Sequence, residues 1–560
     1  METNYWKRNF ERRLTRRRLM AVAGQAGAAG MLIACGGSDG DDKRNEPAAG
    51  VTITPVPTLP PSPLKSAKFG GTVKIGYSGG SLTNFDPHTG ASGAEHQFFF
   101  AICDPLVGYD QKGNLDASIS LAEKWELPEP TKVVLKIRSG VKFQDGTEFS
   151  AEDVKWNIDR VLDPALKATP GSDLASIDSV QVVDKTQVVL KLKQPSAPLL
   201  TNFGDRGGQM ISRTAFEKLG KDAFRRAAVG TGAFTIKEWR DDAYITMERN
   251  PNYWRKDAAG QQLPYLQTIR VDFIPDATVR TAAFETGDID VLLGPGSIDV
   301  KRLIADSNYQ PVDFVGSGTA HWYVNHAFPP FDNVWFRKAF SSGLDRKNYI
   351  KNFLVGDEPI ATGFLNPSTW AHDPKIENYN FDIAKAKDFL QRSGLPPAQW
   401  RVKLQPFGPP ISDAELFWAT SLKEAGIIVD WAEPERDGWQ KHVLKGLGGD
   451  GSAGAFYSGF SLRVDPDGHM GPMFYQKGAY NAGQAPTPEV EPLLLKARET
   501  YVQEERKKLY SEAQKAAVEQ QYSSAMVHYS VSRAFARKKV GNFSAFFGGE
   551  GKPRFASLWV

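Results

Sequence analysis

The sequence predicts a mixed α/β fold divided into two or three subdomains, and three observations support this. The chain has 560 residues, whereas a single hydrophobic core stops growing near roughly 250–300 residues. Apolar residues make up 41% and charged residues 24% of the chain, which is typical of a globular protein. From residue 68 onward, short β-branched segments alternate with segments of helical periodicity, so neither an all-helical nor an all-strand class fits.

Strands dominate the first half of this region. The segments 133–140 and 179–193 have the β-branched composition and internal turns of strands, and 232–250 reads as a hairpin around two aspartates. A helix is expected over 151–162, because Ser150 precedes it as a capping residue.

Helices dominate the second half. Each predicted helix ends at a glycine or is bounded by turn-forming residues. They cover 275–287, 333–344, 381–394, 413–426 and one long segment, 490–520.

The charge of the chain is unevenly distributed. The formal net charge is +3, but seven of the 68 basic and two of the 65 acidic residues lie in the first 34 positions. The remainder therefore carries a net charge of about −2, without the basic stripe that binds nucleic acid. A nucleic-acid partner is not expected.

The first 34 residues have the features of an export signal and are excluded from the fold. Thr15 to Met20 reads TRRRLM, which resembles the twin-arginine signal with Arg16 and Arg17 as its pair. The sequence LIAC then resembles a lipobox, at which a bacterial lipoprotein is cut before its cysteine and acylated. Cys35 is therefore predicted to be the lipid-modified N-terminus.

Residues 35–67 are predicted to form a flexible tether rich in Pro, Ser and Thr. A transmembrane anchor is the alternative for the leader. Spanning a bilayer takes about 20 strongly apolar residues, whereas the apolar stretch at 19–34 has 16 residues and several glycines. A lipid-anchored protein outside the cytoplasm is favoured, with either one or two cell membranes.

Four collinear blocks carry a family resemblance: 121–161, 229–254, 323–350 and 381–396. In this order they resemble the peptide-type family 5 solute-binding proteins of ABC importers, and the match spans about 68–545. The resemblance implies the periplasmic-binding-protein fold (class II, the large cluster C type), with two α/β lobes, a hinge and an interlobe cleft. Residues 68–317 plus 528–560 are expected to form lobe I, and residues 318–527 lobe II.

The same resemblance implies a function. It predicts an extracytoplasmic substrate-binding component that captures a peptide or similarly sized polar solute by lobe closure and delivers it to a membrane permease with its ATPase. No cofactor, metal or catalysis is expected. The alternatives are a surface sensor or chaperone on the same fold, or a secreted hydrolase.

Two motifs could indicate other chemistry. Residues 76–80 match G-x-S-x-G, but the helix that this motif needs after the serine is missing from the pattern. Residues 465–468 read DPDG, without the third oxygen ligand and closing glutamate of a calcium loop. A turn or binding loop is the better interpretation there.

Ligand contacts are predicted at aromatic residues in loops where the lobes would face one another, because aromatic faces with a few polar groups hold small molecules. These are Phe85, Trp322, Trp370 and Phe460.

Arg463 is the most informative departure from the family. Dipeptide and oligopeptide binders of the family have W-x-x-D here, with the Asp holding the ligand's α-amine, whereas this chain places Arg463 at that spacing after Phe460. A guanidinium repels an ammonium, so we expect Arg463 to select a ligand with a carboxylate or several hydroxyls, while Asp465 and Asp467 orient Arg463 or accept from ligand donors. An ordinary peptide amine is expected only if Asp465 or Asp467 has taken the role of the missing Asp. The alternative is that Arg463 pairs with Asp465 as a structural brace.

The lipobox yields a direct test. In the variant Cys35→Ala, acylation is lost, so the processed protein should leave the membrane fraction when cells are fractionated. Processed Cys35→Ala protein that stays with the membrane would contradict the assignment.

Overall fold

The computed structural model describes residues 67–78, 82–90, 92–314, 317–354, 358–435, 437–461 and 463–560. The predictions for Arg16, Arg17, Cys35 and nearly all of the tether concern residues outside this part of the chain.

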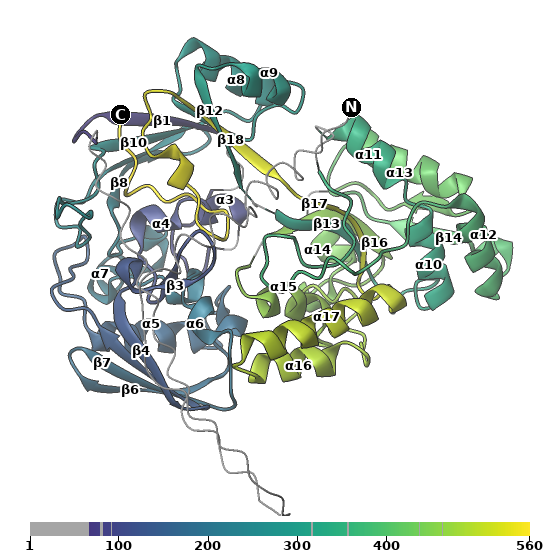
Figure 1. Ribbon diagram of the computed structural model, residues 1–560, viewed down its shortest axis with the longest axis horizontal. Coiled ribbons are helices and arrows are strands. Elements are labelled where there is room, and N and C mark those ends of the chain that lie inside the picture. Colours follow the sequence, from purple (N-terminus) through teal and green to yellow (C-terminus); the bar gives the residue numbers. More distant parts are fainter. Residues whose placement is uncertain are drawn as a thin grey trace, which may run out of the picture. The chain divides into compact units, whose positions relative to one another are not determined.

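A seven-stranded mixed sheet is built from both ends of the described chain (Figure 1). β1 pairs in parallel with β10 and β11, and the other pairings are antiparallel. The order across the sheet is β12 (Tyr309–Phe314), β18 (Ser532–Arg537), β11 (Val291–Leu293), β1 (Thr72–Tyr77), β10 (Thr268–Phe273), β9 (Tyr244–Arg249) and β8 (Phe234–Arg240).

A four-stranded antiparallel sheet follows in the same region, in the order β4 (Ala122–Glu129), β5 (Lys132–Ile137), β7 (Gln187–Leu192), β6 (Ile177–Asp184). β5 alternates buried and half-buried residues, so one face packs on α5 (Ala151–Leu162) in a shared apolar cluster. The backbone N–H and hydroxyl of Ser150 both donate to Asp153 at 2.9 Å, which confirms the predicted helix start.

Short elements complete this part of the molecule. The helices are α3 (Gly93–His96), α4 (Phe99–Ile102), α6 (Leu199–Asn202), α7 (Arg213–Phe224), α8 (Ala277–Thr286) and α9 (Val300–Ala305). The remaining pieces are β2 (Gly108–Tyr109), β3 (Leu115–Asp116) and the 3₁₀ turns η1 (Ala117–Ile119), η2 (Gly171–Asp173), η3 (Arg206–Gly208) and η6 (Phe543–Ala545).

A five-stranded sheet forms the second α/β unit. β13 is antiparallel to β16 and β17, whereas β14 is parallel to β15 and β16. The order is β15 (Ile428–Trp431), β14 (Arg401–Leu404), β16 (Ala455–Ser461), β13 (Ser317–Val324), β17 (Ser524–Tyr529). The helices that accompany this sheet are α10 (Val334–Ser342), α11 (Arg346–Phe353), α12 (Ile383–Arg392), α13 (Asp413–Glu424), α14 (Gly438–His442), α15 (Pro466–Phe474), α16 (Glu491–Glu499) and α17 (Gln503–Gln520), with η4 (Pro397–Gln399) and η5 (Lys445–Leu447).

The chain crosses between the sheets twice. β12 and β13 are consecutive yet lie in different sheets, and so are β17 and β18. We call residues 67–314 plus 532–560 lobe I and residues 317–529 lobe II. The predicted division between 527 and 528 falls inside β17. The predicted two-lobe α/β fold is confirmed.

The prediction of one long helix over 490–520 is wrong. α16 ends at Glu499, Thr500 and Val502 are extended, and α17 begins at Gln503. Two β-branched residues flank Tyr501, which weakens the helix locally. The ring of Tyr501 packs against the apolar cluster of the four-stranded sheet, so tertiary contact decides where the helix breaks.

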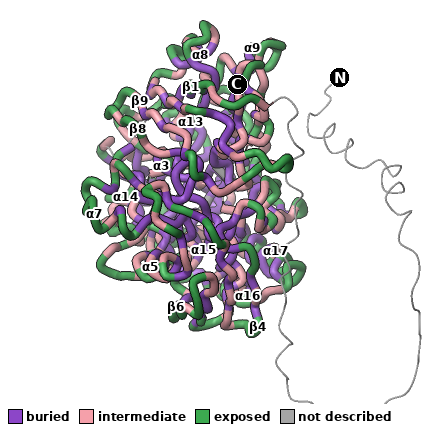
Figure 2. Tube along the Cα trace, turned by 90° about the vertical axis from the view of Figure 1, so that its left-hand side faces the viewer, coloured by how far each residue is buried: buried purple, intermediate pink, exposed green. Residues whose placement is uncertain are grey.

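Each lobe has its own apolar interior. The clusters of lobe I lie behind the seven-stranded and four-stranded sheets, and those of lobe II on the five-stranded sheet. Figure 2 shows buried positions running through the interior of the fold and exposed positions along outer helices such as α7. Cys103 belongs to the lobe I core and is 1% exposed, like a small apolar side chain.

Six histidines are buried in these interiors: His88, His96, His321, His326, His469 and His528. Burial is the main cause that lowers the pKa of His96, His321 and His469 to about 3, and that of His88, His326 and His528 to about 4. An unfolded chain titrates its histidines near about 6.5. Between pH 6.5 and about 4 the unfolded state therefore binds protons that the folded state does not.

Stability should consequently fall as the pH is lowered through this window, by up to about 1.4 kcal/mol per pH unit for each such histidine. Differential scanning calorimetry at pH 7.5, 6.5, 5.5 and 4.5 should show a progressive drop in Tm. The variant His321→Phe should make the drop shallower, because His321 already packs among aromatic rings. A Tm that is constant from pH 7.5 to 4.5 would contradict the prediction.

Candidate functional site

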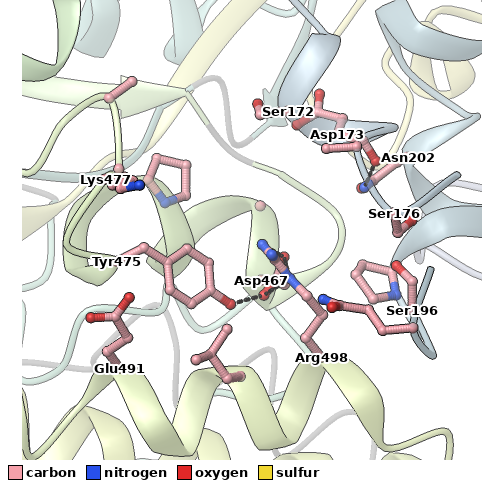
Figure 3. Close-up of a pocket in the computed structure, with 18 of the residues that line it drawn as sticks. Ser172, Asp173, Ser176, Ser196, Asn202, Asp467, Tyr475, Lys477, Glu491 and Arg498 are labelled. Atoms are coloured by element: carbon pink, nitrogen blue, oxygen red, sulfur yellow. Dashed lines mark hydrogen bonds and ion pairs between the residues drawn. The ribbon is translucent and has the colours of Figure 1, made fainter. Parts of the chain in front are cut away.

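A pocket of about 570 Å³ lies between the two lobes (Figure 3). Lobe I contributes η2, the segment after β7 and α6, and lobe II contributes α15, the turn after it and α16. Its walls hold both carboxylates and cations. The polar residues that line it include Ser172, Asp173, Ser176, Lys193, Ser196 and Asn202 of lobe I, and Asp467, Tyr475, Lys477, Glu491 and Arg498 of lobe II.

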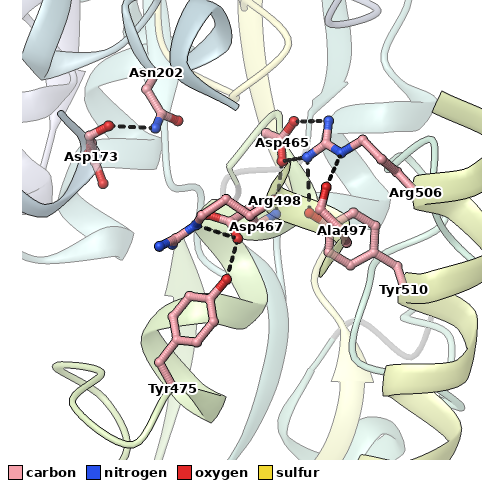
Figure 4. A network of polar contacts seen from close by, with 9 residues as sticks. All are labelled: Asp173, Asn202, Asp465, Asp467, Tyr475, Ala497, Arg498, Arg506 and Tyr510. Carbon is pink, nitrogen blue, oxygen red and sulfur yellow. Dashed lines mark hydrogen bonds and ion pairs between the residues drawn. The ribbon is translucent and has the colours of Figure 1, made fainter. Parts of the chain in front are cut away.

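Asp467 is the centre of the lobe II wall. Its carboxylate accepts hydrogen bonds from Arg498 Nη2 at 2.8 Å and Nε at 3.1 Å, and from the Tyr475 hydroxyl at 2.6 Å. Burial alone would lower the pKa of Arg498, but the adjacent Asp467 outweighs it and raises that pKa. The Arg498 guanidinium therefore stays charged in the pocket wall, where it contacts Asp467 (Figure 4).

Asp465 anchors the same segment from the inside. It is the N-cap of α15, where its side chain accepts from Asp467 N at 2.9 Å. Arg506 of α17 donates to both of its carboxylate oxygens, at 2.9 and 2.7 Å, and also to Ala497 O and the Tyr510 hydroxyl (Figure 4). This satisfied, buried pair is the geometry in which an internal ion pair is tolerated. The alternative prediction that Arg463 pairs with Asp465 is wrong, because Arg506 is its partner.

Arg463 lies between β16 and α15, with its guanidinium carbon 5.8 Å from the centre of the Phe460 ring. Burial would lower its pKa, but Asp205 and Asp173 of lobe I outweigh this and raise it. Burial raises the pKa of Asp173 to about 6, although Arg463 partly opposes that rise. Arg463 of lobe II is thus a cation that interacts electrostatically with Asp205 and Asp173 of lobe I.

The predicted aromatic contacts fall at different depths. Phe85 is fully buried against Phe99 and Trp239 in lobe I. Trp322 is fully buried on β13, and Phe460 is 6% exposed on β16. The expectation that Trp322 and Phe460 lie in loops is wrong, because both lie on strands of the five-stranded sheet and pack into apolar clusters of lobe II.

Trp370 lies in a turn, half-buried, with the Arg506 guanidinium 5.2 Å from its ring centre. Among the described residues, Asp467 is the one predicted ligand contact that lines the pocket of Figure 3.

The sequence does not identify several of the pocket residues. Arg498 lies within 490–520, which the sequence pattern predicts as one helix, and Tyr475 and Asp173 lie in segments without a recognisable motif. Asn202 donates to Asp173 O at 2.9 Å and so joins α6 to η2. These residues meet because distant segments fold together, and no local spacing signals it.

The comparisons identify the family. The model of the bacterial extracellular solute-binding proteins, family 5, matches residues 118–481. The chain belongs to this family. Its members are binding proteins that work outside the cytoplasm. Among the described residues, the helices lack the length and apolarity needed to cross a membrane.

Relatives cover most of the chain. Heme-binding protein A of Haemophilus influenzae is 28% identical over 72% of this chain and 77% of its own length. The dipeptide-binding protein of Escherichia coli is 26% identical over 83% of this chain and 91% of its own.

A solved structure shows the same fold. The periplasmic binding protein DppA of Helicobacter pylori, in complex with the peptide STSA, superposes with a TM-score of 0.77 at 24% identity. The match covers 88% of this chain and 98% of that one.

The buried pair Asp465–Arg506 should be essential to lobe II. Arg506→Gln leaves the Asp465 carboxylate buried without its cation, so the free energy of unfolding should fall by about 3–5 kcal/mol, measured by urea denaturation. Arg213→Gln is the matched control, because Arg213 pairs with Glu217 on the exposed face of α7, and it should leave the denaturation midpoint unchanged. Equal midpoints for both variants would refute the assignment.

Proposed function

We propose that this protein is the substrate-binding component of an ABC importer, which captures a peptide or similarly sized polar solute by lobe closure and passes it to a membrane permease. The observation that carries the proposal is the pocket with walls from both lobes. A site assembled by two lobes exists in full when they are closed, so a bound solute favours the closed state.

The size and chemistry of the pocket support this class of ligand. Its volume of about 570 Å³ lies within the range of roughly 300–1,000 Å³ typical of small-molecule sites. Asp173 and Asp467 offer acceptors, while Lys193, Lys477 and Arg498 offer donors. Relatives that bind a dipeptide or a tetrapeptide favour a polar solute of that size.

Arg463 favours one class of solute. We propose that Arg463, Phe460 and Asp467 select a ligand that carries a carboxylate or several hydroxyls. The support is the charged guanidinium beside an aromatic ring. Phe85, Trp322 and Asp465 are assigned instead to the cores and to the buried ion pair.

The lobe division is part of the proposal. The sequence predicts lobe I at 68–317 plus 528–560 and lobe II at 318–527. The crossings from β12 to β13 and from β17 to β18 support a hinge near these boundaries, with the second one moved to the connection after Tyr529. The export signal at Arg16 and Arg17 and the lipid anchor at Cys35 remain proposals from the sequence.

We further propose that the protein binds solute without changing it. The G-x-S-x-G match at 76–80 begins in β1 and extends past the described residues. A calcium loop at 465–468 is disfavoured, because Arg506 and Arg498 occupy the carboxylates of Asp465 and Asp467.

Solute capture should appear as stabilisation by mass action. A ligand at 100 times its Kd adds about 2.7 kcal/mol to the free energy of unfolding. A thermal-shift panel of peptides, sugars and opine-like acids should therefore yield a raised Tm for one class, with the compound recovered intact by mass spectrometry. Turnover of a compound without any stabilisation would favour the hydrolase alternative.

A further inference from the structure

The break between α16 and α17 touches the opposite lobe. The Tyr501 hydroxyl donates to Pro130 O at 2.7 Å, and Ser196 N donates to the same hydroxyl at 3.1 Å. Pro130 lies in the turn between β4 and β5, and Ser196 follows β7. The Tyr501 hydroxyl of lobe II thus makes hydrogen bonds to two separate segments of lobe I, one as donor and one as acceptor.

A third hydrogen bond lies beside these two. Ala197 N donates to Arg498 O at 2.8 Å. The side chain of the same arginine holds Asp467 in the pocket wall, and Ser196 lines that pocket too. The contact between the lobes and the wall of the pocket therefore share residues.

These hydrogen bonds lie far from the two crossings, so they strongly oppose the separation of the two lobes. The strands that flank the two crossings, β12 with β13 and β17 with β18, lie in the upper half of Figure 1, whereas α16 lies in the lower half, on the side of β4 and β6. A small rotation at the crossings displaces this distant rim by the largest amount. Bonds at the rim therefore resist opening more effectively than bonds near the crossings.

The chemistry of the contact suits repeated opening. The donors and acceptors are backbone groups of loops and one tyrosine hydroxyl, all of which water can satisfy once the lobes separate. Tyr501 is half-buried and Pro130 is exposed in the turn. Breaking the contact leaves no buried charge behind, unlike breaking the Asp465–Arg506 pair.

We propose that Tyr501, together with the backbone of Arg498, is a latch that holds the rim of the interlobe pocket closed and slows the release of bound solute. This proposal rests on the proposed function, because a latch on the rim has a role only if the lobes open and close around a ligand. Tyr501 is a positioning residue in this account and does not contact the solute.

Hydrogen–deuterium exchange of the purified protein tests the latch directly, because Ser196 N and Ala197 N donate across the lobes. Tyr501→Phe keeps the ring and removes the hydroxyl. Exchange in the peptide that covers 194–199 should become roughly tenfold faster, while Tm and the exchange of β13 and β17 stay unchanged. Tyr522→Phe is the matched control, because the Tyr522 hydroxyl bonds Glu489 within lobe II, and its 194–199 exchange should equal that of the wild type.

Unchanged exchange at 194–199 in Tyr501→Phe would overturn the latch, and so would faster exchange spread equally over both lobes with a lowered Tm. The second outcome would make Tyr501 an ordinary stabilising residue. Either result is distinguishable from failure of the receptor proposal, in which no solute raises the Tm of the wild type whatever the exchange shows.

Discussion

The buried ion pair between Asp465 and Arg506 is the interaction on which the lobe II wall depends. The two side chains are 5% and 7% exposed, so each needs the other as its counter-ion. Asp465 also caps α15, and Arg506 also bonds the carbonyl of Ala497 at the end of α16. One pair therefore places α15, α16 and α17 together. Because Asp467 lies on α15 and Arg498 on α16, this packing of the helices also fixes the positions of both residues in the pocket wall.

The contrast between the interiors and the interlobe contacts explains how such a protein can bind and release. Within each lobe, extensive apolar clusters hold the sheets and helices as one body. Between the lobes, the described contacts include the hydrogen bonds of Tyr501 and of the Arg498 carbonyl. Polar contacts of this kind separate at little cost, because water replaces them.

The elements that could be predicted from the sequence are those set by local chemistry. The strands within 179–193 and 232–250 follow from β-branched alternation and turn residues, and α5 follows from the Ser150 cap. The helices at 275–287, 333–344, 381–394 and 413–426 are confirmed for the same reason. The candidate site was predictable to a smaller degree, since Asp467 was identified but its partners Arg498 and Tyr475 were not.

By itself, the sequence determined the family, the α/β class and most secondary-structure elements. The signals for these are the alternation of apolar and polar residues, the helix caps and the collinear family blocks, and each depends on residues that are close in the sequence. Tertiary structure alone decided which cation pairs with which carboxylate: Arg506, 41 residues from Asp465, displaces the nearer Arg463 from that role. It also decided the break in 490–520, where Tyr501 bonds segments 305 and 371 residues away. Such contacts depend on the packing of distant segments, which no local pattern encodes.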